Sequence, residues 1–131
     1  ANLRGWGSHI QLLGDDGAPS ATLRAGPGQQ VRATVKGWIY NNNGDTCIHQ
    51  LVLACDAEVV AEISNHVPRR GSDLNKKIRF QAPREAGAYM LWRYKDLQYS
   101  MRDARRNFQT RHGTVQVGKY PQSFVGWLVV E

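Results

Sequence analysis

The sequence lacks the signatures by which many enzymes and membrane proteins are recognised. It contains no G-x-S-x-G, H-E-x-x-H or C-x-x-C motif and no glycine loop of the phosphate-cradling type. No apolar run approaches the roughly 20 residues of a membrane-spanning helix. We therefore expect a protein without a membrane span that binds a ligand, catalyses no reaction and needs no cofactor.

Cysteine is also scarce, and the spacing of its two occurrences argues against a disulfide. If residues 47–55 form one extended strand, the rise per residue places Cys47 and Cys55 roughly 26 Å apart. The Cα atoms of a disulfide lie within about 7 Å of each other, so both residues are expected to be thiols. Thiols favour a reducing compartment such as the cytosol, and secretion stays the alternative.

Histidines and carboxylates are scattered rather than clustered. His49 lies two residues from Cys47, which would place both side chains on one face of a strand. A structural zinc site takes four ligands, however, and this pair supplies two. The carboxylates fall in turns or on expected solvent faces. We therefore predict no metal site.

Short runs rich in Val, Ile, Trp and Tyr alternate with turn clusters along the chain. Clusters of Gly, Pro, Asn and Asp recur at residues 14–17, 26–28, 41–45, 68–71 and 83–87. Between them we expect strands at 6–13, 21–24, 31–40, 48–55, 58–63, 77–81, 88–94 and 124–130. About seven or eight strands predict one all-β domain over residues 1–131, an immunoglobulin-like antiparallel β-sandwich.

One segment departs from the strand pattern. Ser100 is followed by Asp103, the arrangement of a helix N-cap with an acidic residue at the third helical position. Met101, Ala104 and Phe108 then fall on one face of a helix. A short helical insertion of two turns is therefore expected near residues 100–108, before the last strand.

Several turn and strand-entry motifs follow one another between residues 24 and 94. They are Pro-Gly-Gln at 27–29, an Asn-rich turn after the first long strand, a hairpin around Asp56, and an AP…G-x-Y-x-L pattern at 82–91. In this order they resemble the CARDB-like, immunoglobulin-like adhesion-type sandwich domains of bacteria. The helical insertion and the end around Trp127 do not match that pattern. The resemblance implies a non-catalytic adhesion or ligand-presenting module and no particular ligand.

Aromatic residues fall on strand faces that otherwise carry polar residues. Alternation in the strand 31–40 turns Trp38 and Tyr40 outward, and in the strand 88–94 it turns Trp92 and Tyr94 away from the core. A flat aromatic ring stacks on the apolar face of a sugar, while Asn and Asp bind its hydroxyls. We therefore predict a carbohydrate-binding, lectin-like module that recognises a glycan through Trp38, Tyr40, Asn42, Asn43, Asp45, Trp92 and Tyr94.

Both tryptophans of this site also admit a structural interpretation. Gly37 can mark a bulge, and one extra residue would turn Trp38 into the core. The expected helix can lie over the face of Trp92 and Tyr94, with Met101 and Phe108 packed on them. Trp6 and Trp127 have no polar neighbours and are expected to be structural.

Basic residues outnumber acidic ones by 17 to 11, giving a formal net charge of +6. This excess favours anionic partners, and a polyanion binder is one alternative function. Its ligand would be a sulfated glycan or a nucleic acid, although Asp96 and Asp103 interrupt the basic run and argue against nucleic acid. The residues that would carry it are Arg102, Arg105, Arg106 and Arg111.

A second alternative is a protein–protein interaction domain. Exposed aromatic and arginine side chains are the usual hot spots of protein interfaces, so the same residues serve this function equally well. The free strand edges of a sandwich also favour a homodimer.

Overall fold

The structure is a computed structural model that describes residues 6–41, 47–68, 71–112 and 123–131. In this part of the chain eight strands and one helix follow one another. Their bounds are β1 (Trp6–Leu13), β2 (Thr22–Ala25), β3 (Gln30–Asn41), β4 (His49–Cys55), β5 (Glu58–His66), β6 (Ser72–Gln81), β7 (Gly87–Asp96), α1 (Met101–His112) and β8 (Phe124–Val130). The predicted all-β sandwich with a short helix is confirmed, although α1 is longer than the expected two turns.

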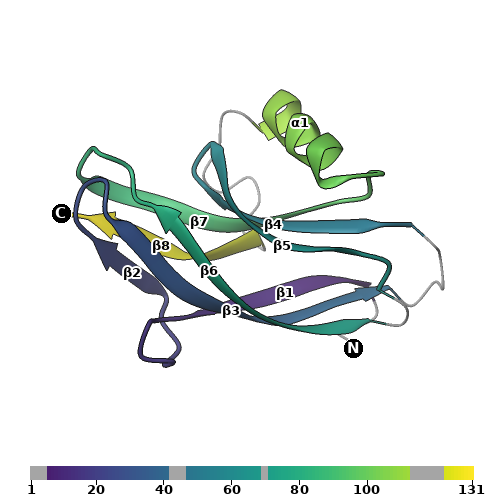
Figure 1. Ribbon diagram of the computed structural model, residues 1–131, viewed down its shortest axis with the longest axis horizontal. Coiled ribbons are helices and arrows are strands. Elements are labelled where there is room, and N and C mark those ends of the chain that lie inside the picture. Colours follow the sequence, from purple (N-terminus) through teal and green to yellow (C-terminus); the bar gives the residue numbers. More distant parts are fainter. Residues whose placement is uncertain (1–5, 42–46, 69–70, 113–122) are drawn as a thin grey trace.

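The strands form two sheets that pack face to face (Figure 1). One sheet has three strands in the order β1-β3-β6, and the other has five in the order β2-β8-β7-β4-β5. Neighbouring strands are antiparallel except for β2 and β8, which run parallel with Leu23 opposite Leu128. The chain leaves β1 in the three-stranded sheet and enters β2 at the edge of the five-stranded sheet, beside β8.

The core lies between the two sheets and follows the alternation of the strands. In β3 Val31, Val35 and Ile39 point inward and are buried, and Arg32 and Lys36 between them are exposed. The inward face of β3 is therefore the face that the sequence predicted. In contrast, every residue of β4 is buried, because this strand is covered on both faces.

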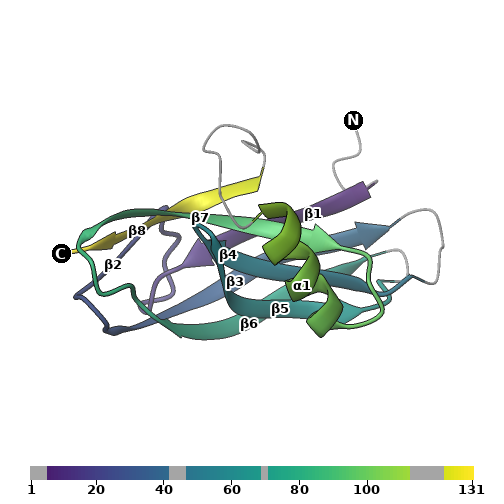
Figure 2. The ribbon, with the colours of Figure 1, turned by 90° about the horizontal axis from the view of Figure 1, so that it is seen from above.

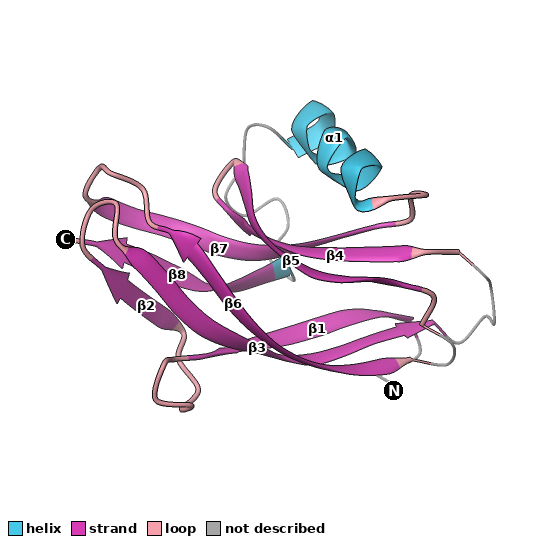
Figure 3. Cartoon of the chain, in the orientation of Figure 1, coloured by secondary structure: helices cyan, strands magenta, loops and turns pink. Residues whose placement is uncertain are grey.

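Helix α1 provides the second cover for the five-stranded sheet (Figures 2 and 3). The Ser100 Oγ accepts a hydrogen bond of 3.1 Å from the Asp103 amide, which is the N-cap that the sequence predicts. Phe108 is fully buried against Trp92, and the two ring centroids lie 5.4 Å apart. No helix in the described residues is long and apolar enough to span a membrane.

The hairpin between β4 and β5 turns at Asp56, as predicted. Asp56 adopts a left-handed backbone conformation with φ of 47°, which Asp tolerates better than most residues. Its carboxylate accepts a 2.9 Å hydrogen bond from the Met90 amide, and its carbonyl accepts one of 2.9 Å from the Trp92 indole. The turn is therefore tied to β7, and it fixes Trp92 in its buried position.

Candidate functional site

The outward side of the three-stranded sheet, here called the outer face, is the polar face of the sandwich. The helix lies on the opposite sheet, and the side chains of the outer face are exposed or half-buried. Strand register places them in rows that run across β1, β3 and β6. The outer face includes His9, Gln11, Leu13, Arg32, Thr34, Lys36, Trp38, Tyr40, Asp73, Asn75, Lys77 and Arg79.

Trp38 remains on the outer face because Gly37 does not introduce a bulge. The register of β3 with both neighbouring strands is continuous through this position. The glycine is required for another reason: a Cβ at Gly37 would collide with the carbonyl oxygen of His9 on β1. Trp38 is half-buried, and its ring centroid lies 6.1 Å from that of His9.

Tyr40, the next outward residue of β3, is also half-buried. Its ring packs against Gly71, where φ is +114° and a Cβ would collide with the ring. Glycine is thus required there by both backbone conformation and space. The other three predicted contacts of this group, Asn42, Asn43 and Asp45, lie outside the described residues.

The second predicted aromatic group is covered by α1. Trp92 is 2% exposed and packs with Met90, Ala54 and Phe108. An indole this deeply buried has no ring face available for stacking on a sugar, so Trp92 is removed from the site. The structural interpretation, in which the helix covers this face, is the one that the structure shows.

Tyr94 belongs to the same covered group and serves to anchor the helix. Its hydroxyl donates to Asp96 Oδ2 at 3.0 Å and accepts from Asn107 Nδ2 at 3.1 Å. Burial raises the pKa of Asp96, but hydrogen bonds from Asn107, Gln98, the Leu97 amide and Tyr94 outweigh this effect and leave it below its usual value. The role of Tyr94 is therefore structural in this geometry.

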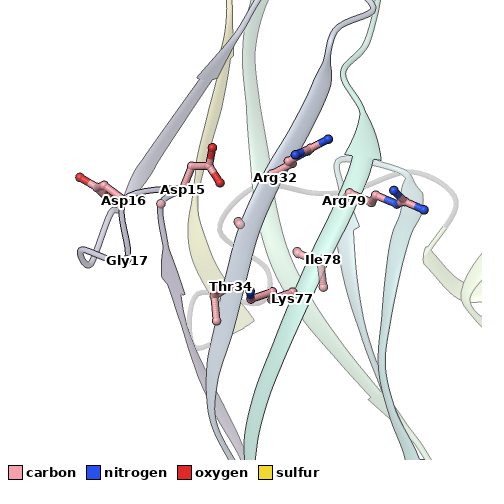
Figure 4. Close-up of a pocket in the computed structure, with 10 residues that line it drawn as sticks. Asp15, Asp16, Gly17, Arg32, Thr34, Lys77, Ile78 and Arg79 are labelled. Atoms are coloured by element: carbon pink, nitrogen blue, oxygen red, sulfur yellow. The ribbon is translucent and has the colours of Figure 1, made fainter.

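An open groove of about 630 Å³ lies on the outer face around Thr34 (Figure 4). We call it the basic groove. Trp38 lies further along β3, toward the C-terminal end of the strand. Arg32 leans from β3 toward β6, where Arg79 lies, and Lys77 reaches from β6 toward Thr34. The turn after β1 forms the opposite wall and carries two carboxylates. The groove is lined by Gly14, Asp15, Asp16, Gly17, Arg32, Ala33, Thr34, Lys77, Ile78 and Arg79.

The arginines of α1 are less available than the sequence suggests. Arg105 Nε lies 2.7 Å from Glu62 Oε2 on β5, so this guanidinium is engaged in an ion pair. Arg102 and Arg106 are exposed. The side chain of Arg111 lies outside the described residues. Among its described side chains α1 therefore presents two exposed arginines, compared with three exposed cations in the basic groove.

Sequence reasoning missed an exposed aromatic pair on β8. Phe124 and Trp127 are 40% and 39% exposed, and their ring centroids lie 5.6 Å apart. The expectation that Trp127 is structural does not fit this exposure. Alternation could have identified it, because Leu128 and Val130 point inward and leave Trp127 on the opposite face.

The two cysteines lie in different environments. Cys47 is exposed before β4 begins, whereas Cys55 is buried at its end. Burial, assisted by the nearby charges of Asp56 and Glu58, raises the pKa of the Cys55 thiol to about 12. Among the described residues no group of three or more His, Cys, Asp or Glu side chains is placed to hold a metal ion.

Comparisons of the chain with protein-family models, with curated proteins and with solved structures found no match. The resemblance to CARDB-like domains therefore stays a prediction. The outer face carries both an indole and a charged groove, and β3 contributes residues to each.

Proposed function

We propose that this protein is a non-catalytic carbohydrate-binding module that holds a glycan on the outer face of its three-stranded sheet. The observation that carries the proposal is the placement of Trp38. Its indole is half-buried, lies beside His9, and belongs to a sheet face whose other side chains are mostly polar. A half-buried indole is held in one orientation and still offers apolar surface to a ligand.

The residues around Trp38 supply the hydrogen bonds that sugar hydroxyls require. Asp73 is directly opposite Trp38 on β6, and Lys36 precedes it by two residues on the same face of β3. Gln11 and Asn75 flank Lys36 on the two neighbouring strands. Neighbouring strands are about 4.8 Å apart and same-face residues about 7 Å apart, so one ring stacked on Trp38 would reach several of these groups.

A glycan array followed by two matched tryptophan variants tests this proposal. The purified protein should bind a subset of glycans, and Trp38→Ala should weaken that binding at least tenfold because the stacking surface is lost. Trp127→Ala is the control, since it removes an exposed indole from the other sheet. A blank array, or loss of binding in Trp127→Ala with Trp38→Ala unaffected, would show that the proposal is wrong.

The edge of β1 favours a second candidate function, association with another protein chain. Natural sheets protect their edges with charge, shortness or bulges. The other three edge strands do so: β2 has four residues, β5 has two register shifts, and β6 carries Lys76, Lys77 and Arg79. In contrast, β1 contains no Asp, Glu, Lys, Arg or Pro. The following segment covers the C-terminal end of this edge, where the Ser20 amide donates to the Leu12 carbonyl at 3.0 Å and Pro19 forms a bridge with Leu13.

A second copy of this chain is the simplest partner for such an edge, through antiparallel pairing of β1 with β1. Sedimentation velocity should then show a dimer that dissociates when Gln11, an exposed residue of β1, is replaced by lysine in Gln11→Lys. A monomer at the highest attainable concentration, or a dimer insensitive to Gln11→Lys, would contradict pairing at this edge.

A further inference from the structure

We infer that the basic groove binds an anionic group, a carboxylate or a sulfate, so that the glycan held on the outer face is an acidic one. This inference rests on the proposed function and specifies its ligand class. It concerns a different surface from the arginines of α1, which lie on the opposite sheet.

The register of β3 and β6 places Arg32 directly opposite Arg79. The Ala82 amide donates to the Gln29 carbonyl at 2.8 Å. Gln29 and Ala82 are therefore a hydrogen-bonded pair, and such pairs alternate with non-hydrogen-bonded pairs along antiparallel strands. Arg32 and Arg79 lie three pairs further along, so they form a non-hydrogen-bonded pair. At such positions the Cα atoms are about 4.5 Å apart and the side chains are at their closest.

Like charges placed directly opposite each other destabilise a sheet. The partner seen for Arg32 is the neutral Gln30, whose Oε1 accepts from Nε and Nη2 at 3.3 and 3.2 Å. The ion pairs Arg24–Glu131 and Arg105–Glu62 involve neither Arg32 nor Arg79. A bound anion would turn this repulsion into a two-sided attraction, because guanidinium groups donate in a fork that matches carboxylate and sulfate oxygens.

Lys77 provides a third cation next to the pair. It lies two residues before Arg79 on the same face of β6, and its side chain reaches toward Thr34 on β3 (Figure 4). The Thr34 hydroxyl is available at the same place as both a donor and an acceptor. Three cations and a hydroxyl thus line one groove, with Arg32 and Lys77 turned toward the neighbouring strand and the Arg79 side chain extending away from β3 (Figure 4).

The opposite wall of the groove selects the kind of anion. Asp16 Oδ1 accepts from the Ala18 amide at 3.0 Å within its own turn, while Asp15 is exposed at the groove. A nucleic-acid backbone carries a phosphate at every unit and few or no free hydroxyls, so a carboxylate wall repels it. A sugar acid carries neutral hydroxyls beside the charge of each unit, and those hydroxyls can donate to Asp15. The mixed lining therefore favours an acidic sugar over a nucleic acid.

The basic groove and Trp38 are placed so that one oligosaccharide can contact both. Arg32 and Trp38 are six residues apart on the same face of β3, a distance of roughly 20 Å along the strand. An oligosaccharide laid along β3 would stack on the indole at one end and place an acidic unit in the groove at the other. Binding should therefore depend on both ends when the glycan is acidic and on Trp38 alone when it is neutral.

Isothermal titration with three probes tests the inference. The probes are an oligogalacturonate, its fully methyl-esterified neutral form, and a heparin-derived sulfated oligosaccharide. The acidic probes, one or both, should bind at least tenfold more tightly than the neutral one. Arg32→Gln and Arg79→Gln should reduce that affinity to the neutral level, whereas Arg102→Gln, an exposed arginine on α1, should leave it unchanged.

The outcomes separate the inference from the function on which it rests. Equal affinity for acidic and neutral probes, lost in Trp38→Ala, would overturn the acidic class and leave the glycan-binding function standing. Loss of acidic binding in Arg102→Gln but not in the groove variants would place the anion on α1 and overturn the inference. Absence of binding to any glycan would overturn both. Because Arg32 and Arg79 are exposed, circular dichroism of their glutamine variants should remain that of the native protein.

Discussion

Replacement of Arg79 by glutamate is expected to stabilise the protein while it abolishes anion binding. The substitution converts the directly opposed Arg32–Arg79 pair into an opposite-charge pair at the same position of the sheet. An opposite-charge cross-strand pair contributes about 0.2–1 kcal/mol, and a like-charge pair costs a similar amount. Both side chains are exposed, so solvent screening reduces the combined gain to about 0.5–1 kcal/mol.

Thermal unfolding followed by circular dichroism measures this gain. For a domain of this size, about 0.5–1 kcal/mol corresponds to a rise in Tm of about 2–4 °C. The rise should shrink in about 1 M salt, where the Debye length falls to about 3 Å. Arg84→Glu is the matched control, because it makes the same change of net charge in the exposed turn between β6 and β7.

Two results would refute this reasoning. One is a Tm for Arg79→Glu that is unchanged or lower at low salt. The other is an equal rise in Arg84→Glu, which would attribute the effect to net charge rather than to the opposed pair. A rise in Tm specific to Arg79→Glu, together with weaker binding of an acidic glycan, would show that the opposed arginines lower the stability of the protein and are needed for ligand binding.

Three further predictions concern Phe108, the two cysteines and the half-buried Asp96. Phe108→Ala should lower the free energy of unfolding in urea by about 3–5 kcal/mol and shift the emission of Trp92 to longer wavelength, because α1 no longer covers it; unchanged emission would contradict this. Iodoacetamide at pH 8 should label the exposed Cys47 and spare Cys55, whose pKa of about 12 keeps it protonated; mass spectrometry reads the sites. The lowered pKa of Asp96 contributes stability that is present above its unfolded pKa and lost as pH falls through the folded value. In Asp96→Asn, the free energy of unfolding should therefore depend less on pH below about pH 4 than it does in the native protein.

Local patterns were sufficient to predict most of the fold. Alternation in β3 identified which residues face the core, since one face of a strand is buried and the other is solvated. Ser100 marked the start of α1 because an N-cap is a local interaction between a side chain and the first turn. The Asp56 hairpin is likewise set within a few residues of the chain.

The site depended on contacts that no local pattern contains. Alternation placed Trp92 on the outward face of β7 correctly, but its burial follows from where α1 packs. In the sequence, Gly37 could indicate either a bulge or a close approach of two strands. The structure shows the close approach, because the His9 carbonyl on β1 leaves no room for a Cβ at this position. The opposition of Arg32 and Arg79 requires the register of two strands that are more than 40 residues apart, which the sequence alone does not reveal.

The most direct test of the central claim is a ¹⁵N–¹H NMR titration that follows the indole signals during addition of an oligogalacturonate. If the glycan lies on the outer face, the Trp38 signal should shift saturably while those of Trp92 and Trp127 stay in place, since Trp92 lies under α1 and Trp127 on the other sheet. A Trp38 signal that does not move, or a shift confined to Trp127, would contradict the account.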